Sequence, residues 1–222
     1  MGEVGAKPCF STMLKNKRTL KNKYRFVQKG TMIYMTEETI PTKEAKKEVE
    51  ISTRRLALLH LSYANTLIQE LGEDKGTRLI MKAIKNYGIR IGERTRREVL
   101  DQKLETSPEN FGKSDCLRVP KFGHHERGET YEVNGEKRTR VYGCVMDKLW
   151  KEYGEEKLGR LYCYVDPAKY MAYNSGFKLI HIKALPDGDD CCEMAVRLTT
   201  EKERKDFLSK DKDWSYLDKK IQ

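Results

Sequence analysis

The fold is decided by residues 141–198, which read VYGCVMDKLWKEYGEEKLGRLYCYVDPAKYMAYNSGFKLIHIKALPDGDDCCEMAVRL. The segment starts as the end of a strand and continues into two helices with apolar faces, over 146–153 and 155–173. It then alternates as a strand over 177–185, turns at a run of proline, aspartate and glycine, and returns as a second strand over 192–199. This order predicts an antiparallel sheet packed against helices.

Two long helices are predicted upstream, over 42–71 and from about 73 to 104, with Gly72 between them. Apolar residues recur in both at spacings of three, four and seven, which is typical of a helix with one buried face. The side chains predicted to face the core are Val49, Leu56, Leu59, Tyr63, Leu67 and Leu71 in the first helix, and Leu79, Ile80, Ala83, Ile84, Tyr87 and Ile91 in the second.

Two glycines, Gly88 and Gly92, lie one turn apart in the second of these helices. A glycine in a helix interior costs about 0.5–1 kcal/mol relative to alanine, so a pair of them needs a reason. Close packing against another backbone is the first interpretation. Room for a ligand is the alternative.

Further strands are predicted between the long helices and residues 141–198. Residues 114–119 have the composition of a strand. Residues 129–143 predict a hairpin that turns at Asn134-Gly135, a dipeptide typical of tight hairpin turns. At the other end of the chain, a charged helix is predicted to begin at Thr200. The residues predicted to dock this terminal segment are Phe207, Trp214 and Leu217.

The fold class predicted is therefore α+β: a long N-terminal helix pair packed on a mainly antiparallel sheet, with C-terminal helices. A basic N-terminal arm is predicted over 1–40 and a single domain over 41–222. That domain divides into a helical half (41–110), a sheet and cysteine half (111–200) and a charged terminal helix (201–222).

The composition excludes several classes of protein. Hydrophobic residues make up 38% and charged residues 35% of the 222 residues, which is enough apolar material for a folded core. No apolar run approaches the roughly 18–20 residues that cross a bilayer. The N-terminus, MGEVGAKPCF, lacks the apolar region of a secretory signal. A cytoplasmic protein without a membrane partner is expected.

The net charge of +10 is concentrated at the N-terminus. Residues 1–30 contain eight Lys or Arg and a single acid, Glu3, so this segment alone carries +7. A basic arm over 7–29 is the only hint of nucleic-acid binding, because no helix-turn-helix, zinc finger or basic-aromatic sheet motif accompanies it. The sequence therefore does not favour nucleic acid as a partner.

The six cysteines form no CxxC pair. In a reducing compartment, cysteines are more often buried, catalytic or metal-bound than disulfide-linked. Cys191 and Cys192 are adjacent, so on a strand their side chains point to opposite faces. The remaining cysteines of the decisive stretch, Cys144 and Cys163, meet Cys192 only if the helices fold back onto the sheet.

Residues 141–198 resemble the L-2-amino-thiazoline-4-carboxylic acid hydrolase family, and a looser likeness extends over about 45–200. The features that carry the resemblance are Cys144 at the end of a strand, the Trp150 helix, the stretch from Gly159 to Cys163 with Asp166, the Asn174 segment, and Gly188-Asp189-Asp190 followed by Cys192. Two positions depart from the family pattern. Met194 replaces an aromatic residue, and Val145 replaces the proline that commonly follows the first cysteine.

A fainter likeness links the chain to 4-vinyl-reductase-type ligand-binding domains, which share a helical N-terminal half and a glycine-bearing hairpin that ends in a cysteine strand. Some of those domains bind zinc through cysteines near the hairpin. This likeness implies the same α+β fold. It also raises an alternative function, a non-catalytic small-ligand or zinc-binding sensor domain.

The family resemblance implies a hydrolase that opens a cyclic isothiourea with water to give a carbamoyl-cysteine. The reaction needs a nucleophile at the carbon between sulfur and nitrogen. Cys144 is the preferred nucleophile, because it precedes a predicted helix whose N-terminus favours a thiolate. His181 is a candidate base, as are His124 and His125. Asp166 is a candidate for orienting a histidine or activating water.

Arg160 and Arg197 are candidate clamps for the substrate carboxylate, and Asn174 is a third candidate substrate contact. In the metal alternative, Cys144, Cys163 and Cys192 bind zinc and a zinc-bound water attacks. No organic cofactor is indicated. A small-molecule substrate is the expected partner, and a homo-oligomer is left open.

Overall fold

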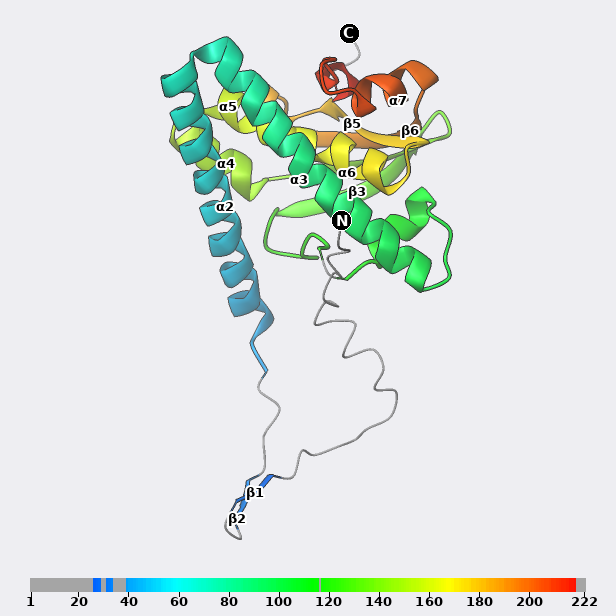
Figure 1. Ribbon diagram of the computed structural model, residues 1–222. Coiled ribbons are helices and arrows are strands. Elements are labelled where there is room, and N and C mark those ends of the chain that lie inside the picture. Colours follow the sequence, from blue (N-terminus) through cyan, green and yellow to red (C-terminus); the bar gives the residue numbers. More distant parts are fainter. Residues whose placement is uncertain (1–25, 29–30, 34–38, 116, 219–222) are drawn as a thin grey trace.

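The computed structural model of the chain describes residues 26–28, 31–33, 39–115 and 117–218 (Figure 1). The helices are α2 (Thr42–Leu71), α3 (Glu73–Asp101), α4 (Val145–Glu152), α5 (Glu156–Arg160), α6 (Val165–Tyr173) and α7 (Glu201–Leu208). The strands are β1 (Phe26–Gln28), β2 (Thr31–Ile33), β3 (Arg127–Val133), β4 (Glu136–Tyr142), β5 (Phe177–Lys183) and β6 (Cys192–Leu198). The short 3₁₀ helices are η1 (Pro108–Lys113), η2 (Leu161–Tyr164), η3 (Leu185–Asp187) and η4 (Ser215–Asp218).

The predicted α+β fold is confirmed: a helix pair, an antiparallel sheet and C-terminal helices are all present. The basic arm predicted at 7–29 lies outside the described residues, except for the backbone of β1. Cys9 and Cys116 also lie outside them. Among the described residues, no helix has the combination of length and apolar content that spanning a membrane requires.

The main sheet has the strand order β3–β4–β6–β5, and every neighbouring pair is antiparallel. The β3–β4 hairpin turns at Asn134 and Gly135, whose φ angles of 51° and 80° are those of a tight hairpin turn, as predicted. The strand predicted over 114–119 is wrong, because the described residues there are irregular. Ser114 instead donates its hydroxyl to Glu98 of α3 at 2.7 Å, which fastens this segment to a helix.

The helices cover one face of the sheet in two layers, with α6 between β5 and α3 (Figure 1). The two helices touch at the glycine pair of α3. A Cβ atom on Gly88 would lie 2.5 Å from the Cβ of Ala168, and one on Gly92 would lie 2.2 Å from the carbonyl oxygen of Lys169. These distances confirm close packing as the reason for the glycines and leave no room there for a ligand.

The predicted inward face of α2 is confirmed at Leu67, which packs against a buried cluster, but it is wrong at Leu56, Leu59 and Tyr63. Leu59 and Tyr63 are 52% and 66% exposed, and the buried residues of this helix are instead Ala57, His60, Leu61 and Ala64. The small side chain of Ala57 lets α2 approach α4 closely, where the Trp150 Nε1 atom donates to the Ala57 carbonyl at 3.4 Å. In α3, Ile80 and Ile84 are buried as predicted, whereas Leu79 and Tyr87 are exposed and glycines share the buried face.

The single helix predicted over 155–173 is interrupted. It divides into α5, η2 and α6. Pro167 lies in the first turn of α6 and has no N–H group to donate to the Cys163 carbonyl, so a continuous α-helix cannot form across this point. The interruption places Cys163 in a 3₁₀ turn immediately before α6.

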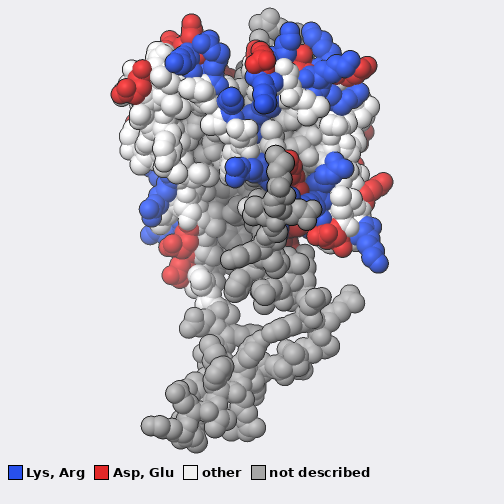
Figure 2. Space-filling model, in the orientation of Figure 1, with Lys and Arg blue, Asp and Glu red and all other residues white. Residues whose placement is uncertain are grey.

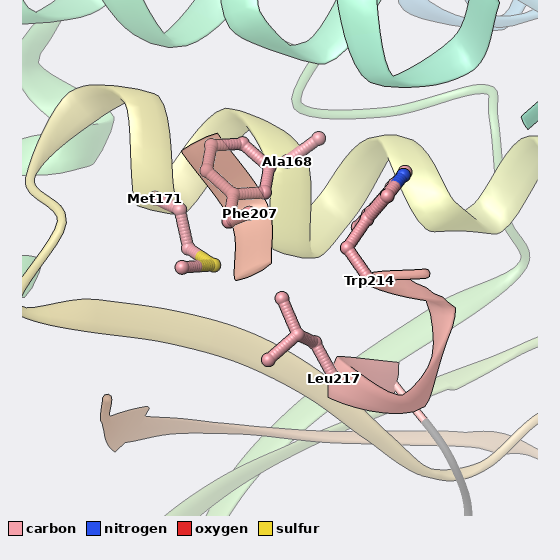
Figure 3. Close-up of a cluster of buried hydrophobic side chains, with 5 residues drawn as sticks. All are labelled: Ala168, Met171, Phe207, Trp214 and Leu217. Atoms are coloured by element: carbon pink, nitrogen blue, oxygen red, sulfur yellow. The ribbon is translucent and has the colours of Figure 1, made fainter. Parts of the chain in front are cut away.

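The C-terminal segment closes the far side of α6. A capping box between Thr200 and Glu203 starts α7, as two reciprocal hydrogen bonds show. Figure 3 shows the predicted docking residues packed on α6, which confirms that prediction. The cluster consists of Phe207, Trp214 and Leu217 together with Ala168 and Met171. The helix itself ends at Leu208, and η4 follows.

The uncovered face of the sheet is charged. Figure 2 shows the opposite, helix-covered side of the molecule, where basic side chains gather towards the top of the view with acidic ones among them. On the sheet, Glu193 is 3% exposed and accepts hydrogen bonds from Arg138 at 2.8 Å and Arg140 at 2.9 Å. Burial by itself would raise the pKa of Glu193, but the nearby Tyr131 hydroxyl and the hydrogen bonds from the two arginines outweigh it and hold the pKa at about 2.

Replacing Glu193 with glutamine is expected to lower the free energy of unfolding by about 2 kcal/mol at pH 7, because charge-assisted hydrogen bonds are lost. The folded-state pKa lies below the unfolded value of roughly 4.3, so this contribution is present above that value and is lost as the pH falls towards 2. Urea unfolding at pH 7, 5 and 3.5 measures the difference. The exposed Glu132→Gln is the control, and a difference that does not change with pH would contradict the assignment.

Candidate active site

Three cysteines from separate elements gather where the N-terminus of α4, the η2–α6 junction and the start of β6 meet. Cys144 immediately precedes α4, Cys163 lies in η2 and Cys192 opens β6. The Cys163 thiol is close enough to the other two to interact with them electrostatically. Cys191 instead lies near Lys183 and Arg140 on the other side of the sheet, as the strand alternation predicts.

The three thiols of this cluster are held in the protonated form. Burial raises the pKa of Cys144 and Cys163, and it raises the pKa of Cys192 to about 12. Cys144 occupies the N-cap of α4, where the backbone amides of Asp147 and Met146 favour a thiolate but do not offset the burial. The sequence predicted a thiolate stabilised by the helix; the structure shows a thiol that needs a base.

His181 is held between two carboxylates at the edge of the sheet. Its Nδ1 atom lies 3.0 Å from both carboxylate oxygens of Asp218, and its backbone N–H donates to Asp218 Oδ1 at 2.6 Å. Its Nε2 atom lies 3.4 Å from Asp166 Oδ2. Asp218 therefore fixes the ring and directs Nε2 towards α6 and the thiol cluster.

Asp166 stays ionised inside this cluster. Burial would raise its pKa, but the Lys169 ammonium group one turn away and His181 more than offset burial, so the pKa lies below its usual range. Lys169 also interacts with the imidazole of His124. Burial, followed by the neighbouring His125, lowers the pKa of His124 to about 4, so its ring is neutral at physiological pH.

His124 is fastened beside Cys144 through its backbone. The Val145 N–H donates to the His124 carbonyl at 3.0 Å, next to the N-cap residue. The ring Nε2 of His124 lies 2.7 Å from Nδ1 of His125. The backbone of His124 thus adjoins the N-terminus of α4, while its ring contacts that of His125.

Arg160 belongs to the cluster, but its guanidinium is already paired. It is nine-tenths buried and donates to Asp187 and Asp218, each at 3.1 Å. It also interacts with the Cys163 thiol. Arg160 thus links the β5–β6 turn to the C-terminal segment. It does so through Asp218, the same carboxylate that contacts His181.

The structure does not bring two of the predicted substrate contacts to the thiols. Arg197 forms a two-point ion pair with Glu136, at 2.6 and 3.1 Å, about 17 Å along β6 from Cys192. Asn174 ends α6, where its amide donates to the Thr106 carbonyl at 2.8 Å. It lies about 12 Å along the helix from Asp166.

An open groove of about 650 Å³ lies between the sheet, the η1 segment and α6. Its walls include Thr139, Leu179 and Met194 from the sheet and Tyr170 from α6. Met194 pairs directly with His181 across β5 and β6, and Cys192 lies two residues before Met194 on the same face. From Met194 the groove extends along the sheet towards Arg197 and Leu198, and neither His181 nor Cys192 is among the residues that line it.

Asp147 is a site residue that the sequence predictions missed. It is 3% exposed, and only its Oδ2 atom has a partner, Lys151 at 2.9 Å. Its Oδ1 atom accepts no hydrogen bond from any described residue. The carboxylate is close enough to Cys144 and Cys192 to raise the pKa of both thiols. The available signal was its spacing, three residues after Cys144.

The cluster gives no support to the zinc alternative. Within the described ranges, no group of three His, Cys, Asp or Glu side chains is arranged to hold a metal ion. This includes the ligand set predicted from the sequence, Cys144, Cys163 and Cys192.

Comparisons with known proteins give one result. Neither the curated proteins nor the solved structures include a match to the chain. A family model described as L-2-amino-thiazoline-4-carboxylic acid hydrolase matches residues 50–196, from within α2 to within β6. The match covers more than half of the chain and includes all three cysteines of the cluster. The chain belongs to the L-2-amino-thiazoline-4-carboxylic acid hydrolase family.

Proposed function

We propose that the protein is a hydrolase that opens the ring of a small sulfur-containing heterocyclic acid of the L-2-amino-thiazoline-4-carboxylate type, with Cys144 as the nucleophile. One observation carries the proposal: the N-cap cysteine of α4 lies in a cluster with Asp166, whose carboxylate is close enough to raise the pKa of the thiol. A thiol, a carboxylate and the histidine that Asp166 faces provide the groups that ring opening by covalent catalysis requires.

In the first step, Cys144 loses its proton to a base and its sulfur attacks the ring carbon between sulfur and nitrogen. The bond between that carbon and the ring sulfur breaks, and the departing sulfur takes a proton. Asp166 is the base in this scheme, because it is ionised and close enough to Cys144 to act on the thiol. His181 supplies the proton through Nε2, the nitrogen that faces Asp166.

In the second step, water attacks the same carbon and the bond to the Cys144 sulfur breaks. The Cys144 thiol regains a proton, and the carbon becomes the carbonyl of a carbamoyl group. The sum is one substrate and one water giving one carbamoyl-cysteine. Asp166, ionised again once its proton has passed to His181, accepts the proton of the attacking water in this scheme.

The substrate carboxylate is assigned to Lys169 in this proposal. Lys169 is a cation of the cluster itself, one turn along α6 from Asp166. Arg197 is held by Glu136 well along the strand, and Arg160 is occupied by Asp187 and Asp218. Lys169, which also pairs with Asp166, thus offers from α6 the anchor that was predicted among the arginines.

The test is to incubate the purified protein with L-2-amino-thiazoline-4-carboxylate and follow two products together. Free thiol is measured with a disulfide reagent, and carbamoyl-cysteine is measured by mass spectrometry. One thiol per carbamoyl-cysteine is expected, with turnover well above the buffer reaction. Binding of the compound without any turnover would instead favour the non-catalytic ligand-binding domain.

A further inference from the structure

We propose that Asp147 determines substrate specificity: its unpaired Oδ1 atom accepts a hydrogen bond from the amino group of a cationic amidine-type substrate held against Cys144. The substrate class is a cyclic isothiouronium or amidinium that also carries a carboxylate. This inference rests on the proposed function, because it assumes that Cys144 attacks the carbon that bears the amino group.

The first argument is the unsatisfied oxygen. Asp147 is 3% exposed, so water reaches its carboxylate poorly, and Lys151 pairs with Oδ2 alone. A buried carboxylate oxygen without a donor is rare in folded proteins and calls for an explanation. A ligand N–H group aimed at Oδ1 supplies the missing donor.

The second argument is the position of Asp147 relative to the nucleophile. Cys144 is the N-cap of α4 and Asp147 is three residues on, so both side chains lie on the same side of the first helical turn. The amino group is bonded to the carbon that the Cys144 sulfur attacks. A substrate in position for attack therefore presents that amino group to the same side of α4.

The third argument is charge. Asp147 and Asp166 both act electrostatically on Cys144, and both raise its pKa. A cation bound between them removes that effect and favours the thiolate, so a cationic substrate assists the activation of its own nucleophile. A neutral analogue with a carbonyl oxygen in place of the amino group would set an acceptor against an acceptor at Oδ1.

The experiment compares two ligands by calorimetry in a Cys144→Ser background, which removes turnover. The probes are L-2-amino-thiazoline-4-carboxylate and its neutral carbonyl analogue, L-2-oxothiazolidine-4-carboxylate. Adding Asp147→Asn is expected to weaken binding of the amino ligand by roughly 10- to 100-fold, the equivalent of a charge-assisted hydrogen bond. The carbonyl ligand is expected to bind equally well or better, because the asparagine amide can donate to it.

Lys151→Met is the matched control, since it removes the partner of Oδ2 and leaves Oδ1 unchanged. It is expected to leave the ratio of the two affinities unchanged. A purely structural role for Asp147 predicts that Asp147→Asn changes both affinities by the same factor, and that result overturns the inference. Thermal melts of each variant identify loss of folding.

Variants with Cys144 intact provide a second measurement. There, Asp147→Asn is expected to lower kcat/KM for the amino substrate by a similar factor, and an unchanged kcat/KM overturns the inference. If the wild-type protein neither binds nor turns over the amino ligand, the proposed function itself fails. If it does both while Asp147→Asn leaves the preference unaltered, only the assignment of Asp147 fails.

Discussion

Replacing Cys144 with serine is expected to lower turnover of L-2-amino-thiazoline-4-carboxylate by roughly 10³-fold or more, while the fold is retained. A serine hydroxyl ionises far less readily than a thiol, and no described side chain compensates for the loss of the nucleophilic sulfur. Initial rates of thiol release measure the effect, and circular dichroism checks the fold.

Cys191→Ser is the matched control for this prediction. Cys191 undergoes the same chemical change, but its side chain lies by Lys183 and Arg140, away from the thiol cluster. Its turnover is expected to stay within a few-fold of the wild-type value. Undiminished turnover in Cys144→Ser would remove the cysteine nucleophile and leave water activated by Asp166 as the remaining mechanism.

The second large effect is expected at the contact between α3 and α6. Gly92→Val is expected to lower the free energy of unfolding by about 3 kcal/mol or more, because the added Cβ alone would lie 2.2 Å from the Lys169 carbonyl oxygen. A backbone atom cannot rotate aside as a flexible side chain can. Chemical denaturation with two probes measures the change.

Gly112→Val is the control for this substitution, since a Cβ atom there meets nothing within 4 Å. It is expected to cost much less than Gly92→Val. The displaced helix carries Asp166 and Lys169, so any Gly92→Val protein that folds is also expected to lose activity. Equal stability of the two variants would mean that α3 and α6 are less tightly packed than the structure shows.

Local sequence signals predicted the architecture well. Gly72 ends α2 with a φ angle of 76°, and Asn134-Gly135 turns the hairpin, because each position requires a backbone conformation that few residues adopt. The inward faces of the long helices were predicted only in part: Ile80 and Ile84 are buried as expected, but Leu59, Tyr63 and Leu79 are exposed. Periodicity counts large apolar residues, whereas alanine and glycine, which the pattern treats as neutral, make several of the closest contacts.

The candidate site was predicted only in part, because residue type can be read from the sequence and burial cannot. Cys144, Cys163 and Cys192 stand out by residue type, and the folding of helices onto the sheet brings them together. Asp147 and Asp218 did not stand out, because each is one acid among many in a chain that is 35% charged. What distinguishes them is burial, which depends on tertiary packing.

The position of Asp218 has a consequence for how this protein is cut for study. The carboxylate that orients His181 comes from η4, beyond residue 196, where the family match ends. A fragment trimmed to the matched boundaries would keep every cysteine of the cluster and still lose the partner of the histidine. It would also expose the apolar side of α6 that Phe207, Trp214 and Leu217 cover. The folded unit of this chain therefore extends beyond the region that the family match covers.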